Sequence, residues 1–546
     1  MIAEARVLQQ QLDTQYHDII VIGTGPAGMR FVTEFVHVNT TSRVAVFGDE
    51  PWLPYNRVNL TSLLTGAIRE DKMYVAFDPA KHSNVSCYFN NRIVKINRHA
   101  KTVIDSQGVC HGYTTLVLAT GSSSFTPNIP GTTLKNVFSF HDLCDAQKLM
   151  SRIVRSRHTI VIGGGLLGLE AARAMQRFNT NVTVIEHSMW LMFRQLDQRA
   201  GSYLKRHLES LGVHVLTSER VLEIYGDDKV QGVLLGTGET IECDTVVLAA
   251  GIVPNLQLIR NSGLYFGKGI RVNDYLQTND PNIYAIGECA EHRKKTYGLV
   301  TPGYEQARVL AYNLNGGHVQ YTGSTATTSL KVLDYPVFSI GEVDLPSRNH
   351  EEIRFQDHHK GIYRRLFLLR GRLRGVVAIG AWPGILRMQE AVTRQQRIWP
   401  WQVSRFIKTG VLWTEDQACN VASWPNATVI CQCMSVTRAH LAQASHQGVS
   451  NVEQLIQLTG AATVCGVCRP LLANFMSVQV ATKSERLPQG ILAVGLMILV
   501  SLLYLVHEHL EFGQQEYRGL YILLTLCGLL LGGVLLHQVI RLSRMN

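Results

Sequence analysis

Four cysteines in the last quarter of the chain have the residue type and the spacing of a metal-ligand set. They form two pairs, Cys431-Gln-Cys433 and Cys465-Gly-Val-Cys468, and 31 residues separate Cys433 from Cys465. Thiolates are soft ligands, and a [2Fe–2S] cluster needs four of them. Structural zinc is the alternative, but most zinc sites have a gap of two to four residues in both halves. The single residue between Cys431 and Cys433 therefore favours a [2Fe–2S] cluster.

Helical patterns surround these cysteines. Ser450-Asn-Val-Glu453 has the form of a capping box that begins a helix, and Gly460 stands where that helix would end. Arg469-Pro470 begins another helix directly after Cys468, so a positive helix end would lie near an anionic cluster. We expect a helical cluster-binding domain at residues 428–480.

Two glycine-rich turns upstream have the form of nucleotide-binding loops. The apolar run 17–22 predicts a buried parallel strand, and Gly23, Gly25 and Gly28 follow it before a helical pattern begins. In such a loop the first glycine allows a tight turn, the second lets the backbone approach a pyrophosphate, and the third lets helix pack on strand. The helix N-terminus then presents amides to the phosphate.

The pattern repeats after the strand at 158–162, with Gly163, Gly165 and Gly168. The next predicted strand ends in Glu186, where an acid binds the ribose 2′-hydroxyl and repels a 2′-phosphate. This loop therefore favours NADH over NADPH. For the first loop we expect Glu50 to be the ribose-binding acid, although Gly48 occupies the usual position at the end of the strand.

Further segments carry a family resemblance. The strand–turn segments that end at Thr120-Gly121 and at Gly251, and the segment around Gly287-Glu288, resemble those of pyridine nucleotide-disulfide reductase-like flavoproteins. In that family the first loop holds FAD and the second holds NAD(P)H. The resemblance implies two crossing segments between these domains, and an acid at 288 on the ribityl chain of FAD.

Narrower matches lie in the stretches 50–57, 191–197 and 297–302, which resemble the flavoprotein half of nitrite reductase large subunits. Arg57, in the first of them, is implied to bind FAD. The cysteine segment resembles the bacterioferritin-associated-ferredoxin type of [2Fe–2S] domain, which nitrite reductases carry after the flavoprotein. Siroheme-binding domains come next in those subunits, and their absence from this chain predicts that it does not itself reduce nitrite.

The chain departs from its relatives beside the first loop. No cysteine lies between Pro51 and Leu64, which excludes disulfide-reductase and peroxidase chemistry because both need a thiolate beside the flavin. Ser62 replaces the lysine of rubredoxin reductases. Glu170 lies where relatives keep a glutamate close to the flavin–nicotinamide contact, and it is the candidate catalytic residue. It either positions a partner or caps a helix.

The predicted fold is α/β, with two Rossmann-like domains, a small α+β interface domain, the helical [2Fe–2S] domain and two transmembrane helices. The expected boundaries are 17–122 and 254–322 for FAD binding, 123–253 for NAD binding, 327–415 for the interface domain, 428–480 for the cluster and 487–541 for the membrane hairpin. Three strands of the interface domain are expected to begin at Leu330, Val337 and Arg365, and its tryptophans to serve core or dimer packing.

Two uncharged apolar runs, 487–506 and 520–540, are each long enough to cross a bilayer. Lys483 and Arg486 precede the first run, and Arg541 and Arg544 follow the second. The positive-inside rule places both ends in the cytoplasm. With no signal peptide visible, we expect a bacterial inner-membrane protein whose catalytic domains are cytoplasmic.

The net charge of +10 is modest for 546 residues and comes without a lysine-rich run, so no nucleic-acid partner is expected. Five arginines lie between Arg364 and Arg374, around a predicted hairpin turn at Arg370-Gly371. They form either a solvated hairpin or a docking patch for an acidic protein or anionic lipid.

Together these features predict a membrane-anchored reductase that passes electrons from NADH through FAD and the cluster to an acceptor, which is a protein, a haem protein or a quinone. The alternatives are direct reduction of quinone by the flavin, a redox sensor, or a detached subunit of a nitrite or oxygenase system. A homodimer is possible.

Overall fold

The computed structural model describes residues 15–485, except 76, 78–81, 179, 331–334, 344–349, 383, 414–420, 432, 433, 435, 464, 465 and 467. Described residues up to Asn474 belong to one compact unit, and those from Phe475 on belong to a second. Within the described ranges no helix is both long and apolar enough to cross a bilayer. The hairpin predicted at 487–541 lies outside these ranges.

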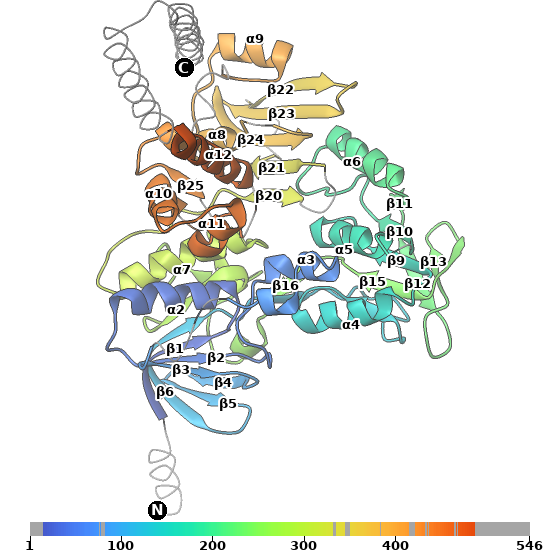
Figure 1. The fold of residues 1–546 in the computed structure, drawn as a ribbon. Helices are drawn as coiled ribbons and strands as arrows, with labels where there is room; N and C mark the ends of the chain where they lie inside the picture. Colours follow the sequence, from blue (N-terminus) through green and yellow to red (C-terminus); the bar gives the residue numbers. More distant parts are fainter. Residues whose placement is uncertain are drawn as a thin grey trace, which may run out of the picture. The chain divides into compact units, whose positions relative to one another are not determined.

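The first nucleotide-binding domain is built on a sheet in the order β3-β2-β1-β6-β5-β4, with β18 beside β6. Helices α2 (Pro26–Val38) and α7 (Val300–Leu314) lie side by side along it (Figure 1). Since β1, β2, β6 and β18 run parallel, their carboxyl ends meet at one edge. The strands are β1 Gln15–Ile22, β2 Val44–Phe47, β3 Val85–Tyr88, β4 Ile93–Asn97, β5 Thr102–Asp105, β6 Cys110–Leu118 and β18 Ile283–Ala285.

The second nucleotide-binding domain repeats this plan with a parallel sheet in the order β11-β10-β9-β15-β8. A three-stranded antiparallel sheet, β12-β13-β14, accompanies it. The strands are β8 Val137–Ser139, β9 His158–Ile162, β10 Asn181–Glu186, β11 Val213–Thr217, β12 Val221–Tyr225, β13 Gly232–Leu235, β14 Thr240–Glu242 and β15 Thr245–Leu248. The helices are α4 Leu143–Ile153, α5 Leu166–Gln176 and α6 Gln198–Ser210.

These two domains also contain shorter strands and helices. They are η1 Arg57–Asn59, α3 Leu60–Leu64, η2 Glu70–Lys72, β7 Ser122–Ser124, β16 Ile252–Pro254, η4 Gln257–Ile259, β17 Ile270–Val272, η5 Gly287–Cys289 and β19 Ala290–His292. The observed architecture is thus the predicted α/β fold with two Rossmann-like halves.

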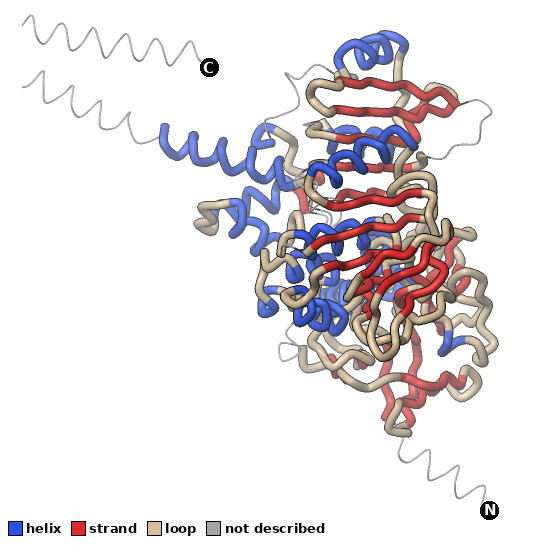
Figure 2. Tube along the Cα trace, turned by 90° about the vertical axis from the view of Figure 1, so that its right-hand side faces the viewer, coloured by secondary structure: helices blue, strands red, loops and turns tan. Residues whose placement is uncertain are grey.

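The next region is an antiparallel sheet in the order β20-β21-β24-β23-β22, whose strands lie side by side in one layer (Figure 2). Its elements are β20 Thr327–Leu330, β21 Val337–Gly341, β22 His350–Asp357, β23 Ile362–Leu369, β24 Arg372–Ile379, α8 Ile385–Thr393 and α9 Pro400–Thr409. The predicted hairpin turn is confirmed, because Arg370 and Gly371 both have positive φ. Trp382 is in the core, but Trp399 and Trp401 are exposed and stack on each other.

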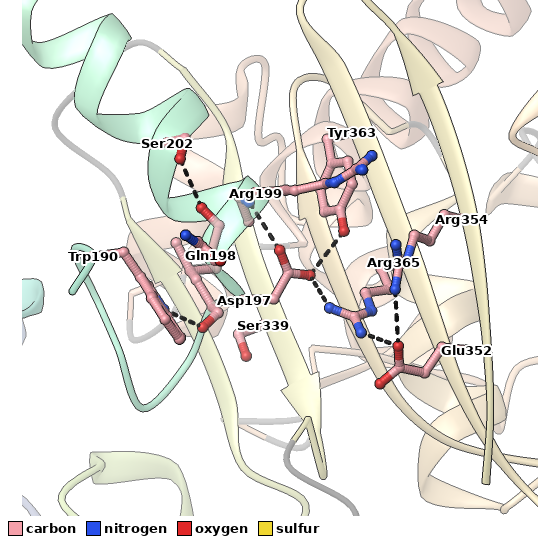
Figure 3. A network of polar contacts seen from close by, with 12 residues as sticks. Trp190, Asp197, Gln198, Arg199, Ser202, Ser339, Glu352, Arg354, Tyr363 and Arg365 are labelled. Atoms are coloured by element: carbon pink, nitrogen blue, oxygen red, sulfur yellow. Dashed lines mark hydrogen bonds and ion pairs between the residues drawn. The ribbon is translucent and has the colours of Figure 1, made fainter. Parts of the chain in front are cut away.

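A polar network joins the second nucleotide-binding domain to this sheet (Figure 3). Asp197 caps α6 by accepting from the Ala200 amide at 2.9 Å. It also accepts from the Tyr363 hydroxyl at 2.9 Å and pairs with Arg365 at 2.8 Å. Arg365 pairs in turn with Glu352. Arg364 is also buried and donates to the Gly410 and Ala381 carbonyls at 2.8 Å. The predicted hairpin is therefore confirmed, but Arg364 and Arg365 are neither solvated nor part of an exposed docking patch.

The cysteine segment is helical, as predicted. Its elements are η7 Val421–Ser423, β25 Val429–Cys431, β26 Val436–Thr437, α10 Arg438–His446, α11 Val452–Thr459 and α12 Arg469–Glu485. Gly460 ends α11 with a φ of 69°, as expected. The cap was placed one residue early, because Asn451 rather than Ser450 accepts from the Gln454 amide, at 2.9 Å. Ser450 instead donates to the Gln454 side chain.

Replacing Asp197 by alanine is expected to destabilise the protein. Arg365, whose side chain is only 13% exposed, would lose one of its two carboxylate partners and keep Glu352, so we expect a cost below the about 3–5 kcal/mol of a buried charge left with no partner. Loss of the cap adds roughly 1 kcal/mol, which Asp197→Asn would spare. Urea unfolding measures both variants. The control is Asp228→Ala, which removes a pair that is 71% and 74% exposed. Equal shifts for Asp197→Ala and Asp228→Ala would contradict this assignment.

Candidate active site and cluster-binding segment

The first glycine loop connects β1 to α2 through positions that only glycine fits. Gly23 has a φ of +122°, and a Cβ added there would lie 2.1 Å from the Ala119 carbonyl oxygen. A Cβ on Gly28 would lie 2.1 Å from the Gly23 carbonyl oxygen. The loop is therefore locked against the end of β6 by backbone-to-backbone contact.

Gly25 behaves differently, because a Cβ added to it would meet no atom within 4 Å. It is the N-cap of α2 and provides no side-chain hydrogen bond, so the first amides of the helix lack a partner from a capping side chain. Pro26 follows at the first helical position. Open space in front of unsatisfied amides is what a pyrophosphate needs, so this loop fits the adenine dinucleotide FAD.

The second loop, between β9 and α5, reproduces this geometry. Gly163 has a φ of +117°, and its added Cβ would lie 2.4 Å from the Ala249 carbonyl oxygen. An added Cβ on Gly168 would lie 2.1 Å from the Gly163 carbonyl oxygen, whereas Gly165 again has open space and no capping side chain. Residues 163–168 therefore fit a second dinucleotide, NADH.

Glu186 ends β10, buried against the second loop. Its Oε2 accepts from the Gly164 amide at 2.6 Å, and its Oε1 accepts from the Ser188 amide at 2.7 Å. His187 lies 3.0 Å from the same Oε1. The carboxylate is thus fixed beside the glycine turn, where a negative charge disfavours a 2′-phosphate.

Glu50 lies in a more crowded place than the sequence indicated. Its carboxylate accepts from the Tyr55 hydroxyl at 2.7 Å and forms an ion pair with Arg57. Glycine occupies the end of β2 because a Cβ at position 48 would lie 2.5 Å from the Thr24 hydroxyl oxygen in the glycine loop. An acidic side chain at the end of β2 would therefore clash with Thr24.

Arg57 is surrounded by polar groups of two domains. Its guanidinium donates to the His141 carbonyl at 3.4 Å as well as pairing with Glu50. Burial lowers the pKa of Arg57, but Tyr55, Glu50, Asp142 and Glu288 together raise it above its ordinary value. Burial is also the main reason that the pKa of Tyr55 is raised. A fixed positive charge therefore lies where the flavin segments meet.

The two crossing segments pair with each other as strands β7 and β16, with Ser123 opposite Val253. Thr120 and Gly121 precede β7, and Gly251 precedes β16. Asn255, which the sequence analysis missed, fastens them: its side-chain amide donates to the Thr120 carbonyl at 2.8 Å, and its backbone amide donates to the Gly121 carbonyl at 3.0 Å. Its spacing of four residues from Gly251 is the only sequence signal.

The second FAD segment reaches the same place. Gly287 has a φ of +80°, and its added Cβ would lie 2.9 Å from the Ala27 side chain in α2. Its amide donates to the Gln306 side chain at 2.7 Å. Glu288 accepts a hydrogen bond from the Ser122 hydroxyl in β7. The structure therefore brings Glu288, Thr120, Gly121 and the first loop to one sheet edge.

Glu170 lies on α5 and is buried. Its Oε2 accepts from the Thr61 hydroxyl at 2.6 Å, across the contact between α3 and α5. This bond reaches a different helix, so it supports positioning rather than capping. Thr61 was missed, although the sequence analysis had noted its neighbour Ser62 as the position of the absent lysine.

The structure describes two of the four predicted cluster ligands. Cys431 ends β25 and Cys468 directly precedes α12, and both side chains are 2% exposed. The amides of Leu471 and Leu472 donate to the Cys468 carbonyl, so Cys468 begins the helix. Cys433 and Cys465 lie outside the described residues. Buried thiols at a strand end and a helix start fit an anionic cluster.

Three family models match consecutive parts of the chain. A pyridine nucleotide-disulphide oxidoreductase model matches residues 17–308, and a rubredoxin NAD+ reductase C-terminal domain model matches 327–396. A BFD-like [2Fe–2S] binding domain model matches 429–477.

Curated proteins and solved structures show the same likeness. An NAD(P)H nitrite reductase of Bacillus subtilis is 36% identical over 465 residues, which are 84% of this chain and 57% of that protein. A nitric oxide reductase FlRd-NAD(+) reductase of Vibrio vulnificus is 28% identical over 66% of this chain and 94% of its own length. A ferredoxin reductase structure from Rhodopseudomonas palustris has a TM-score of 0.66 and 25% identity, and covers 72% of this chain and 100% of its own.

Valine at the two open glycines is expected to separate the cofactors. Both positions have extended backbone, which valine adopts readily, so the fold should survive. Gly165→Val should keep FAD but weaken NADH binding at least about tenfold, because its branched side chain occupies the pyrophosphate space. Gly25→Val should lose FAD. Flavin absorbance after purification and rapid-mixing rates against NADH concentration measure the two effects. Loss of FAD in Gly165→Val would contradict the assignment of the loops.

Proposed function

The chain belongs to the pyridine nucleotide-disulphide oxidoreductases, and on that basis we propose that it is an NADH-dependent electron-transfer reductase with FAD and a [2Fe–2S] cluster. The observation that carries the proposal is the crossing at β7 and β16, which fixes one dinucleotide loop relative to the other. When bound, FAD takes a hydride from NADH and releases its electrons singly, and a [2Fe–2S] cluster accepts them one at a time.

The residues around the crossing have roles in binding and orientation. The loop of Gly163, Gly165 and Gly168 binds the NADH pyrophosphate, and Glu186 selects against an added phosphate. The loop of Gly23, Gly25 and Gly28 binds that of FAD, with Arg57 and Glu288 on the flavin side. The Thr61–Glu170 hydrogen bond joins α3 to α5 and positions Glu170 for the flavin–nicotinamide contact. Chemistry belongs to the cofactor, and the protein positions it.

The acceptor in this proposal is a protein, a haem protein or a quinone. Relatives named for nitrite reductase and FlRd-NAD(+) reductase, and a neighbour titled ferredoxin reductase, support a protein acceptor. The chain spans 57% of the length of that nitrite reductase, so the whole activity of the relative does not carry over.

We further propose that the chain is anchored in a bacterial inner membrane by the hairpin at 487–541. The support is the sequence alone: two uncharged runs of bilayer length and positive residues at both cytoplasmic ends. The catalytic domains would then face the cytoplasm, and the acceptor would lie at the membrane. We also propose that the chain can form a homodimer.

Cys465→Ser is expected to leave flavin reduction by NADH intact and to abolish acceptor reduction, because one cluster ligand is lost. An anaerobic NADH titration followed by visible absorbance and low-temperature EPR measures both steps. The wild type should show flavin bleaching and then a one-electron [2Fe–2S] signal. Cys144→Ser, at an exposed cysteine, is the control and should behave as wild type.

Three other results would redirect the proposal. Rapid quinone turnover in Cys465→Ser would select direct reduction by the flavin. An EPR-silent wild-type protein that contains zinc would make the cysteine segment structural. Very slow turnover with every acceptor, together with a partner bound in only one oxidation state, would favour a redox sensor.

The membrane proposal predicts that the full chain stays with bacterial membranes through washes with high salt and alkaline carbonate, since a spanning helix is not held by surface charge. A chain that ends at residue 485 should be released into the supernatant. Fractionation followed by immunoblotting measures this. Release of the full chain by salt alone would exclude the spanning hairpin.

A further inference from the structure

Two side chains of the first nucleotide-binding domain contact the loops that carry the cluster cysteines. Arg30 reaches Met434, the residue after Cys433. Asn56 reaches Thr463, two residues before Cys465. A residue one or two positions away from each cysteine pair is thus contacted from the FAD side, and all four contacting residues lie in the compact unit that extends to Asn474.

Arg30 is held by the elements that bind FAD. It lies on α2, one turn after the glycine loop, and its guanidinium stands 5.6 Å from the centroid of the Tyr304 ring on α7. It pairs with Glu34, and its side chain is only 16% exposed. Its Nη1 lies 3.9 Å from the Met434 sulfur. A partly buried positive charge is therefore fixed beside the loop of the first cysteine pair.

The Nε atom of Arg30 also indicates an anionic acceptor near this loop. Its Nε–H is buried and has no hydrogen-bond acceptor among the described residues. A buried donor without an acceptor is costly, and charged donors more so. Sulfur atoms of an anionic cluster and its thiolates are acceptors of the appropriate charge, and hydrogen bonds to such sulfurs raise cluster potentials.

Asn56 contacts the other loop with a fixed orientation. Its Oδ1 accepts from the Val58 amide at 3.2 Å, so its Nδ2 is the group that faces the Thr463 carbonyl, at 3.1 Å. Each end of the amide meets a backbone group of the opposite kind, which determines its orientation. Asn56 directly precedes Arg57, so this contact joins the flavin site to the second cysteine loop.

The two loops also contact each other. The Thr463 hydroxyl donates to the Gly460 carbonyl at 2.7 Å. A Cβ added to Gly460 would lie 3.0 Å from the Met434 methyl group. Arg30 thus contacts Met434, which lies close to Gly460, and Gly460 is hydrogen-bonded to Thr463, which Asn56 contacts. Both cysteine loops are attached to the flavin domain and to each other.

We propose that Arg30 and Asn56 are positioning residues that dock the cluster segment on the flavin domain, and that the charge of Arg30 raises the midpoint potential of the cluster. This inference rests on the proposed function. Each electron that the cluster accepts makes it more negative by one unit, so a nearby positive charge stabilises the reduced form. Glu34 offsets part of this charge, but Arg30 is the group that contacts the loop.

Arg30→Gln should lower the midpoint potential of the cluster in the full-length holoprotein. At a fixed solution potential the ratio of reduced to oxidised cluster should fall about three- to tenfold, and a tenfold fall corresponds to about 59 mV for one electron. Arg30→Lys keeps the charge and should retain most of the potential. A redox titration read by EPR measures this.

Arg43→Gln is the matched control, because it removes the same charge from an arginine that is 61% exposed and pairs with Asp18. Arg43 directly precedes β2, at the end of the sheet away from the glycine loop. It should leave the cluster potential unchanged. Equal potentials in wild type and Arg30→Gln would overturn the tuning role of Arg30, as would equal shifts in Arg30→Gln and Arg43→Gln.

Asn56→Asp tests docking. Aspartate still accepts from the Val58 amide but cannot donate to the Thr463 carbonyl, so the second loop should loosen. Hydrogen–deuterium exchange should increase at least threefold in peptides covering 460–468, and electron transfer from reduced flavin to cluster should slow by a similar factor. Unchanged exchange would overturn the docking role of Asn56.

These outcomes are distinguishable from failure of the proposed function. If the wild type binds FAD but gives no [2Fe–2S] signal, the proposed function fails before any variant is compared. If the wild type shows both reductions while the variants match it in potential, exchange and transfer rate, the proposed function stands and this inference alone fails.

Discussion

The arrangement depends on one short pair of strands, β7 and β16, where the chain passes from the first nucleotide-binding domain to the second and back. Domains joined by a single linker are expected to move relative to each other. Two adjacent crossings that hydrogen-bond to each other restrict that motion. Asn255 extends the pairing to Thr120 and Gly121, and Ser122 joins Glu288 to the same point. A few backbone and side-chain hydrogen bonds thus restrict the distance between the two cofactor loops.

The same place concentrates charge. Arg57 is paired with Glu50 and influenced by Asp142 and Glu288, which come from three separate stretches of the chain. Since burial makes an isolated charge costly, the surrounding acids are needed to keep this guanidinium in place. This charge network therefore forms only when these three stretches come together in the folded chain, so the surroundings of Arg57 depend on tertiary structure rather than on any local motif.

Local motifs predicted the two loops, the alternation of strands and helices, and the hairpin at Arg370-Gly371, because each depends on residues adjacent in sequence. Partnerships between distant segments escaped prediction. Thr61 and Glu170 are 109 residues apart, and Asn56 and Thr463 are 407 apart. The burial of Arg364 and Arg365 was also hidden, since a run of arginines looks alike whether it faces solvent or an acidic partner such as Asp197. The cap of α11 shows the finer limit: Ser450 and Asn451 are both good caps, and only backbone geometry chooses between them.

The glycine loops contain two kinds of position, and substitutions at them are expected to have different fates in a cell. Gly23 and Gly163 lie so close to neighbouring backbone carbonyls that a side chain at either position would disrupt the fold itself. Gly25 and Gly165 face open space, so the polypeptide tolerates a side chain and only the absent dinucleotide would clash with it. Quality-control machinery recognises unfolded chains. We therefore expect a chain substituted at Gly23 or Gly163 to be removed by proteolysis, whereas a chain substituted at Gly25 or Gly165 stays folded and persists with impaired dinucleotide binding.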